Sequence, residues 1–120
     1  MSDCIFCKIV AKEIPADILL ENSEYIAFHD LNPKAPVHIL VIPKKHYQSF
    51  QCIPSAMMAT VTSFIQQLVI KMGVDKSGYR LITNVGENGG QEVKHIHFHL
   101  LGGTKLKWER LSDSDPKNMF

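Results

Sequence analysis

The sequence predicts an α+β domain: an antiparallel sheet of about five strands with one long and one short helix. Segments of strand length outnumber helical patterns, and most of them are joined by connections short enough for neighbouring strands to pair. Only one segment keeps a helical spacing of apolar residues over several turns. A chain of 120 residues has room for one core, so we expect a single domain over residues 1–120.

The short helix is expected within residues 4–12. Its apolar residues stand at positions 5, 6, 9 and 10, which form one face of a helix. Ser2 and Asp3 precede them and can cap the first turn. The helix should end before Ile14-Pro15, because the residue before a proline disfavours helical geometry.

Three strands follow. Residues 17–21 and 25–29 form a predicted hairpin whose turn is Asn22-Ser23-Glu24. Residues 32–36 contain two prolines and predict a loop. Residues 37–42 are mostly apolar and predict a strand that Pro43 closes.

The sequence of the second half of the chain predicts the long helix and two more strands. Ser55 is the expected cap of this helix, which stops at Gly73 and has apolar residues at positions 57, 58, 61, 64, 65, 68, 69 and 72. Residues 79–84 predict a strand, residues 86–90 a glycine-rich loop, and residues 95–101 the last strand.

Composition excludes several classes of protein. The chain is 45% hydrophobic and 21% charged, which is typical of a soluble globular domain and not of a disordered, fibrous or membrane protein. A net charge of +1 gives no strong field to attract nucleic acid or anionic lipid. The first residues carry no secretion signal, and Ser2 stands where myristoylation needs glycine, so we expect a cytoplasmic protein.

The segment His95-Ile96-His97-Phe98-His99-Leu100-Leu101 has the strongest chemical signal. In a strand, its three histidines share one face and the apolar residues share the other. The apolar face is expected under the long helix. The histidine face can be a solvated surface that happens to be rich in histidine, but three adjacent imidazoles contribute little stability there.

Two functional interpretations compete for these histidines. A metal site held by all three is strained, since the outer two Cα atoms of a straight strand lie roughly 13 Å apart while metal bonds measure about 2 Å. In the second interpretation one imidazole attacks an electrophile such as phosphorus, and its neighbours orient it. The upstream loop Asn84-Val85-Gly86-Glu87-Asn88-Gly89-Gly90-Gln91 offers backbone amides as a cradle for phosphate oxygens.

The motif matches the His-φ-His-φ-His-φ-φ signature of the histidine triad family of nucleotide hydrolases and transferases, where φ is an apolar residue. Further matches resemble the Hint branch of that family and cover most of the chain. They are Ala27-Phe28-His29-Asp30, Asn32-Pro33, Ala35-Pro36, His38, Val41-Ile42-Pro43-Lys44-Lys45-His46, Asn84, Gly89-Gly90-Gln91 and Leu101-Gly102-Gly103.

The resemblance implies a role for each histidine of the site. His97 corresponds to the nucleophile that takes a nucleoside monophosphate as a covalent intermediate, later released by water. His99 corresponds to the residue that hydrogen-bonds the phosphate. His38 and His95 correspond to supporting imidazoles that fix the ring and its tautomer. The chemistry itself requires no cofactor.

The resemblance also implies a nucleotide site. Asp30 corresponds to the carboxylate that accepts both ribose hydroxyls. The other expected contacts are His29 beside it, the apolar base pocket of Ile5, Phe6, Leu31 and Leu40, and the phosphate side at Asn84, Gly90, Gln91 and Glu92. Simpler roles stay open: Phe6 and Leu40 as core residues, Asp30 and Asn84 as turn formers.

Two features depart from the commonest family pattern. Glu92 stands where many relatives have Ser or Thr, and a carboxylate cannot donate a hydrogen bond unless it is protonated. The C-terminal extension, residues 104–120, is longer than in a minimal Hint chain and contains Trp108. In that branch a C-terminal Trp reaches the partner subunit's active site, so Trp108 is a candidate for substrate selection. A partly exposed aromatic on a loose tail is the alternative.

Cys4-Ile5-Phe6-Cys7 is a second motif. Its sulfurs share one helix face, and Cys-x-x-Cys is a common half of a structural zinc site. Some bacterial histidine triad proteins complete such a site with two histidines, which correspond here to His46 and His95. Two small buried residues without a metal are the alternative, and Cys52 is assigned to packing.

The resemblance therefore implies a homodimeric hydrolase of purine nucleoside 5′-phosphoramidates, and the composition and first residues predict a cytoplasmic protein that binds neither nucleic acid nor membrane. Two alternatives stay open. One is a dinucleoside polyphosphate hydrolase of the same family. The other is a zinc-stapled module that binds a nucleotide or a partner and hydrolyses only incidentally.

Overall fold

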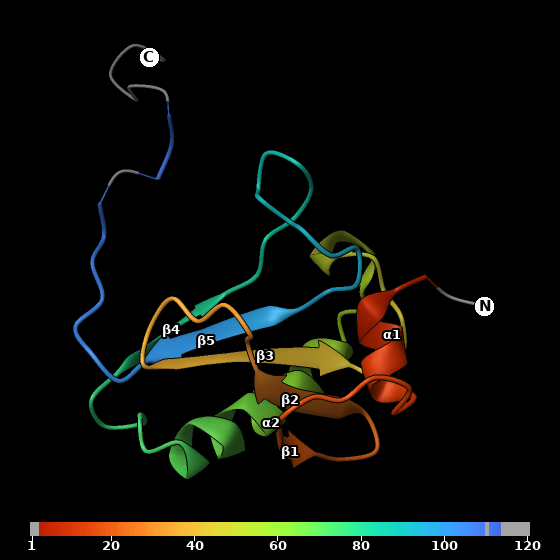
Figure 1. Ribbon diagram of the computed structural model, residues 1–120, viewed down its shortest axis with the longest axis horizontal. Helices are drawn as coiled ribbons and strands as arrows, with labels where there is room; N and C mark the ends of the chain where they lie inside the picture. Colours follow the sequence, from red (N-terminus) through yellow and green to blue (C-terminus); the bar gives the residue numbers. More distant parts are fainter. Residues whose placement is uncertain (1–2, 110, 114–120) are drawn as a thin grey trace.

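The computed structural model in Figure 1 describes residues 3–109 and 111–113. Within these residues, five strands form one antiparallel sheet in the order β1-β2-β3-β5-β4, and two α-helices accompany it. The predicted fold class is confirmed. The elements are α1 (Ile5–Val10), β1 (Ile18–Glu21), β2 (Tyr25–His29), β3 (Val37–Pro43), the 3-10 turn η1 (Phe50–Cys52), α2 (Met57–Lys71), β4 (Tyr79–Ile82) and β5 (Phe98–Gly102).

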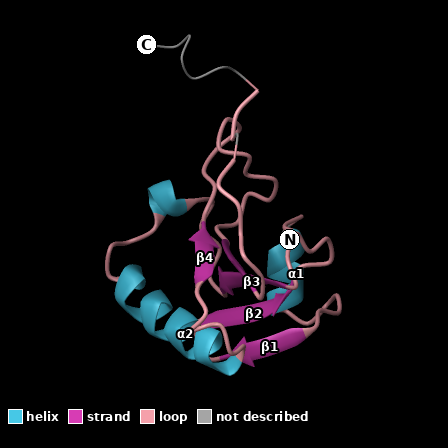
Figure 2. Cartoon of the chain, turned by 90° about the vertical axis from the view of Figure 1, so that its left-hand side faces the viewer, coloured by secondary structure: helices cyan, strands magenta, loops and turns pink. Residues whose placement is uncertain are grey.

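The sheet separates two apolar cores, with α2 on one face and α1 on the other (Figure 2). Strand residues alternate between them because successive side chains point to opposite faces. Tyr25 and Ala27 of β2 pack in the α2 core, whereas Ile26 and Phe28 pack in the α1 core. Ile96, Phe98 and Leu100 lie in the α2 core, as predicted for the apolar face of the histidine motif.

Helix α1 begins one residue after Cys4, whose Sγ accepts a hydrogen bond from the backbone amide of Cys7 over 3.3 Å. Cys4 is therefore the cap, in place of the predicted Asp3; Ser2 lies outside the described residues. The helix ends at Val10, before the expected boundary, and Lys12 then adopts a left-handed φ of 61°.

Helix α2 differs from the prediction at its N-terminus. It begins at Met57 with Ala56 as its cap residue, and no side chain caps it. The amides of Met57 and Met58 donate instead to the carbonyls of Pro54 and Ser55. These tight backbone turns satisfy the first amides, so the Ser55 hydroxyl is not the predicted cap. Gly73 follows the helix with a φ of 73°, in agreement with the predicted stop.

The expected strands over residues 79–84 and 95–101 are both too long. β4 ends at Ile82 and β5 begins at Phe98, so only His99 of the three histidines lies in a strand. Ile96 precedes β5, and its backbone amide donates to the Tyr47 carbonyl over 2.7 Å instead of to a neighbouring strand. The three histidines still lie opposite Ile96, Phe98 and Leu100, on the side of Phe6, but this side is not exposed: His95 is 0% exposed and His97 is 6% exposed.

Candidate functional site

The site lies on the α1 side of the sheet. Leu40 pairs with His99 across β3 and β5, so these two side chains emerge on the same face. His38 lies two residues before Leu40 and shares that face. The ring of Phe6, from α1, contacts the His97 ring edge to face with 5.1 Å between centroids.

The His97 ring is held by the main chain of its own segment. Its Nδ1 lies 2.9 Å from the carbonyl oxygen of His95, and a carbonyl oxygen only accepts hydrogen bonds. Nδ1 therefore carries the proton and donates it to this oxygen. In the neutral ring Nε2 then has the lone pair that a nucleophile needs.

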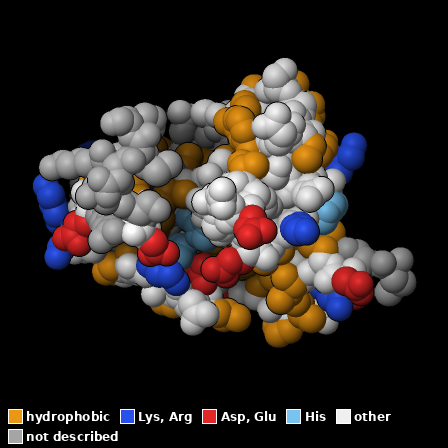
Figure 3. Space-filling model, turned by 90° about the horizontal axis from the view of Figure 1, so that it is seen from above, with side chains coloured by type: hydrophobic (Ala, Val, Ile, Leu, Met, Phe, Trp, Pro, Cys, Tyr) orange, Lys and Arg blue, Asp and Glu red, His pale blue; other side chains and the backbone are white. Residues whose placement is uncertain are grey.

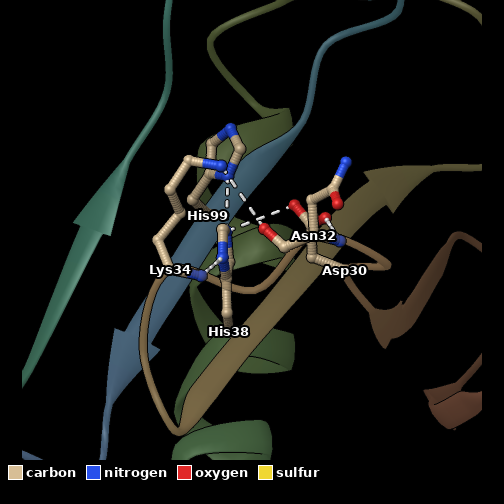
Figure 4. Close-up of polar contacts among 5 residues, drawn as sticks. All are labelled: Asp30, Asn32, Lys34, His38 and His99. Atoms are coloured by element: carbon tan, nitrogen blue, oxygen red, sulfur yellow. Dashed lines mark hydrogen bonds and ion pairs between the residues drawn. The ribbon is translucent and has the colours of Figure 1, made fainter.

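His38 and His99 form a directed chain of hydrogen bonds (Figure 4). The backbone amide of Lys34 donates to His38 Nδ1 over 2.9 Å, so the neutral His38 ring carries its proton on Nε2. His38 Nε2 donates to His99 Nδ1 over 2.9 Å. The proton of neutral His99 is consequently on its Nε2, which is available as a donor.

Burial keeps these imidazoles neutral. The pKa of His99 is lowered from 6.5 to about 4, mainly by burial and further by His97 and His38. Burial also lowers the pKa of His38, although the nearby Asp30 carboxylate opposes this effect. The site therefore combines an N–H donor on neutral His99 with the Nε2 atom of His97, whose Nδ1 holds its proton against the His95 carbonyl. This pair suits attack on a phosphorus atom whose oxygens accept hydrogen bonds.

Asp30 lies at the end of β2 beside this chain. Its Oδ1 accepts a hydrogen bond from the Asn32 amide over 2.8 Å, which forms a side-chain turn. Its Oδ2 lies 3.3 Å from His38 Nε2. The carboxylate thus forms a turn and also faces the histidine chain, while its remaining lone pairs can accept from a ligand.

The second predicted constellation also comes together. The ligand atoms of Cys4, Cys7, His46 and His95 all lie within 4.8 Å of one another. His95 Nδ1 lies 3.3 Å from Cys4 Sγ, 3.5 Å from Cys7 Sγ and 3.1 Å from His46 Nδ1. His46 Nδ1 lies 3.2 Å from Cys7 Sγ.

This donor set fits a zinc ion. Bonds of about 2.0–2.3 Å in a tetrahedron place sulfur and nitrogen ligands roughly 3.3–3.8 Å apart, close to the distances found. His95 Nε2 donates to the Pro43 carbonyl over 2.8 Å, so its Nδ1 presents a lone pair to the cluster. Burial lowers the pKa of His95 to about 4, which keeps this nitrogen unprotonated.

Asp30, His38 and His99 also bring three potential ligand atoms together, but they do not fit a metal ion. The Lys34 amide occupies the lone pair of His38 Nδ1, and the proton is consequently on Nε2, the atom that faces the other two residues. A metal ligand needs a lone pair at that atom. This group is therefore a hydrogen-bond chain.

His95 supports His97 differently from the expectation. The resemblance implies a supporting imidazole, yet the His95 ring faces the Cys4–Cys7 cluster and Pro43. Its support for His97 comes from the backbone carbonyl. The His95 ring thus belongs to the cluster of Cys4, Cys7 and His46, while the His95 carbonyl binds the His97 ring.

The glycine-rich loop uses much of its hydrogen-bonding capacity internally. Gly86 donates to Gln91 Oε1, and Gly90 donates to the Glu87 carbonyl, each over 3.0 Å. Gln91 Nε2 donates to the carbonyls of Gln48 and Val93. Two of the three glycine amides expected to cradle phosphate are therefore engaged within the loop, and Gln91 braces it.

The other residues expected to contact the nucleotide differ in how far they are exposed. Phe6 and Leu40 are buried in the α1 core, as in the simpler interpretation, whereas Ile5 is 48% and Leu31 is 96% exposed. Asn84 is half-buried and Glu92 is exposed. His29 Nε2 lies 3.6 Å from Asp17 Oδ2, outside the histidine chain.

Trp108 lies beside the edge strand β4. The Arg80 guanidinium carbon is 5.3 Å from the centre of the Trp108 ring, and Arg80 also donates to the Lys107 carbonyl. Trp108 itself is 75% exposed. Residues 110 and 114–120 of the expected C-terminal extension lie outside the described residues.

A surface view shows histidine side chains at the floor of a hollow, with acidic side chains beside it (Figure 3). A separate cleft lies next to the zinc-type cluster, between Cys4 at the start of α1 and the segment 92–94. No helix in the described part of the chain is long and apolar enough to span a membrane.

Sequence reasoning missed two residues that shape the site. The Lys34 amide fixes the His38 tautomer, and the Thr83 hydroxyl donates to the His97 carbonyl over 2.9 Å. Any non-proline residue can supply a backbone amide, so the sequence has no signal for the first. Thr83 looked like an ordinary strand residue next to Asn84.

Buried histidines, namely His38, His95 and His97, lie on one side of a five-stranded antiparallel sheet, with His99 hydrogen-bonded to His38. This arrangement defines the class of this protein. Residues 11–106 match the model of the HIT domain family, and the chain belongs to that family. An uncharacterised HIT-like protein of Helicobacter pylori is 52% identical over 101 residues, which cover 84% of this chain and 97% of that protein. HitA of Neisseria gonorrhoeae is 41% identical over 109 residues, which cover 85% and 97%.

Solved structures agree with this assignment. A histidine triad protein from Clostridium difficile superposes with a TM-score of 0.87 at 46% identity, covering 92% of this chain and 98% of that one. A HIT family hydrolase from Legionella pneumophila has a TM-score of 0.85 at 43% identity, covering 88% and 97%.

Proposed function

We propose that this protein is a nucleotide hydrolase of the Hint branch that cleaves purine nucleoside 5′-phosphoramidates through a nucleotidyl intermediate on His97. The observation that carries the proposal is the hydrogen bond from His97 Nδ1 to the His95 carbonyl, since it leaves Nε2 with the lone pair. The Legionella pneumophila and Clostridium thermocellum neighbours are described as HIT family hydrolases, which supports hydrolysis. A Candida albicans neighbour is described as a nucleotide-binding protein.

The reaction has two steps. In the first, His97 Nε2 attacks the phosphorus, a bond forms between them, and the bond from phosphorus to the amine breaks as the amine takes a proton from solvent. In the second, water attacks the phosphorus, the bond to Nε2 breaks, and the nucleoside monophosphate leaves. A proton from the water returns to solvent, so the imidazole is neutral again.

His99 acts on the phosphate oxygens in both steps. Its Nε2 proton points away from His38, because its Nδ1 accepts the His38 hydrogen bond. An N–H donor that is already oriented stabilises charge that develops on phosphate oxygens in the transition state. His38, fixed by the Lys34 amide, keeps His99 in this tautomer.

The nucleotide is proposed to bind beside this pair. Asp30 accepts the ribose hydroxyls, with His29 nearby. Phe6 and Leu40 form the inner part of the base pocket, and the exposed Ile5 and Leu31 form its rim. Asn84, Gly90, Gln91 and Glu92 flank the phosphate and the leaving group.

We also propose a structural zinc ion held by Cys4, Cys7, His46 and His95. Four protein ligands leave no open position for substrate or water, so the zinc would stabilise the fold and take no part in the chemical step. It would tie the start of α1 to the segments around His46 and His95. Reduced thiols agree with the cytoplasm as the proposed compartment.

The proposed assembly is a homodimer of single HIT domains, each comprising residues 1–120 with 104–120 as an extension. β4 is an edge strand, and its Tyr79 and Leu81 side chains are 41% and 43% exposed. Pairing of two β4 edges across a two-fold axis would cover them and continue the sheet. Trp108, next to β4, would then lie near the partner subunit.

Turnover of adenosine 5′-phosphoramidate, of an AMP–lysine conjugate and of a diadenosine polyphosphate tests the function. We expect the phosphoramidates to be hydrolysed with the higher kcat/KM, and a short reaction to add the mass of one nucleoside monophosphate to the protein. His97→Ala should abolish both turnover and the added mass and leave AMP affinity within about tenfold. Preference for the polyphosphate would support the alternative hydrolase, and nucleotide binding without turnover would support the binding module.

A further inference from the structure

β4 and β5 separate next to the proposed nucleophile. The last pair of their ladder joins Ile82 to His99, so His97 lies beyond the paired region. His97 is nevertheless 6% exposed. A buried carbonyl outside a sheet needs another hydrogen-bond donor, because leaving it without one costs free energy.

The Thr83 side chain supplies that donor. Thr83 is the first residue after β4, and its hydroxyl donates to the His97 carbonyl over 2.9 Å. Thr83 is half-buried, and His97, whose carbonyl it binds, is buried. The side chain therefore holds the two segments together one step beyond the point where their backbone pairing stops.

Other contacts also hold the segment that leads into His97, since the His95 ring donates to the Pro43 carbonyl and faces the two cysteines and His46. The Ile96 amide donates to the Tyr47 carbonyl over 2.7 Å, and the His97 ring donates to the His95 carbonyl over 2.9 Å. The Thr83 hydroxyl binds the main chain of His97 itself, from the residue that follows β4. Its bond acts directly on the His97 main chain and so on the position of the ring.

We propose that Thr83 is a positioning residue for His97, whose backbone it holds so that Nε2 meets the substrate phosphorus in line. This inference rests on the proposed function, in which His97 is the nucleophile. Thr83 acts through His97 and does not touch the substrate. An error of about 1 Å in the position of a reacting atom costs up to about 100-fold in rate, so one backbone hydrogen bond can matter for catalysis.

Two substitutions at this position isolate the hydroxyl. Thr83→Val has nearly the same shape and no donor, whereas Thr83→Ser keeps the donor and loses a methyl group. Thr62→Val is the matched control, because Thr62 is exposed on α2 and its hydroxyl donates to the Met58 carbonyl, far along the chain from the site. We expect Thr83→Val to lower kcat roughly 10- to 100-fold with KM within about threefold. Thr83→Ser and Thr62→Val should stay near the wild-type kcat.

A spectrum of the His97 ring gives a readout that does not depend on turnover. Proton–nitrogen correlation spectra of labelled protein should show shifted or doubled His97 ring signals in Thr83→Val and unchanged signals in the other two variants. If the wild-type protein hydrolyses no nucleotide conjugate, the proposed function fails and this spectrum alone decides the role of Thr83. The proposal is overturned if Thr83→Val keeps the wild-type kcat, or if Thr83→Ser and Thr83→Val lose kcat equally. If there is no turnover, unchanged His97 ring signals in Thr83→Val would overturn it.

Discussion

His97 donates its Nδ1 proton to the backbone carbonyl of His95, two residues earlier, over 2.9 Å. The ring of the same His95 is fully buried and presents Nδ1 to the two cysteines and His46. A metal-type cluster and a candidate nucleophile are thus connected through one residue, by its side chain on one side and its main chain on the other. Because the two contacts use different atoms, His95 can ligate a metal ion and still orient His97.

We predict one equivalent of zinc per chain in protein purified without a chelator. Cys4→Ser should lower the zinc content and the Tm while leaving kcat within a few-fold, since the ion has no open position for substrate. A serine hydroxyl can still accept the Cys7 amide, so the substitution keeps the α1 cap and removes a metal ligand.

Cys52→Ser is the matched control for the zinc prediction, because Cys52 is exposed and lies outside the cluster. Elemental analysis and thermal unfolding with and without a chelator measure both effects. Zinc far below one equivalent, with no stabilisation when zinc is added, would assign Cys4 and Cys7 to packing.

Asp30→Asn should reduce the preference for ribonucleotides over 2′-deoxyribonucleotides by about tenfold or more, because a charge-assisted hydrogen bond is worth roughly 1.5–3 kcal/mol. The amide oxygen of Asn can still accept from the Asn32 amide, so the turn at the end of β2 should persist. Binding constants for the two sugar types measure the ratio.

Asp17→Asn is the control for the ribose prediction, as Asp17 faces His29 and not the His38–His99 chain. An unchanged sugar ratio together with a lower kcat would place Asp30 as a partner of His38 only. An unchanged ratio and an unchanged kcat would leave it as a turn former.

The free energy of unfolding should fall as the pH drops from about 6.5 to about 4. The pKa of His99 is lowered from 6.5 to about 4 in the folded chain, mainly by burial. Between these values the unfolded chain takes up a proton that the folded chain does not, so protonation favours unfolding; below pH 4 the effect levels off. Urea unfolding at a series of pH values measures how the free energy of unfolding changes with pH. This dependence should be weaker in His99→Gln, and an identical dependence would contradict the lowered pKa of His99.

Sedimentation should give the mass of a dimer, and Leu81→Lys should shift it toward the monomer. Leu81 is an exposed apolar residue on β4, and a buried lysine at a paired edge carries a desolvation cost. Ile18→Lys places the same change on β1, the opposite edge of the sheet, and should leave the dimer intact. Dissociation by Ile18→Lys alone would assign the interface to β1.

The sequence by itself predicted the fold class, the approximate positions of both helices and the candidate residues that the structure brings together in two clusters. Those properties follow from local patterns: alternation in strands, helical spacing in residues 57–71, and the histidine and cysteine spacings. The apolar side of the histidine motif was also predictable, because Phe98 and Leu100 alternate with the histidines.

Tertiary structure alone decided how the histidines are used. The segment before Phe98 lies outside the strands, where the Tyr47 carbonyl and the Thr83 hydroxyl, distant in sequence, bind it, and the His95 ring there faces the cysteines. The tautomers of His38 and His97 depend on the backbone groups of Lys34 and His95, which any sequence could supply. Spacing along a chain can bring ligands to one face, but only the packed main chain sets which nitrogen carries the proton.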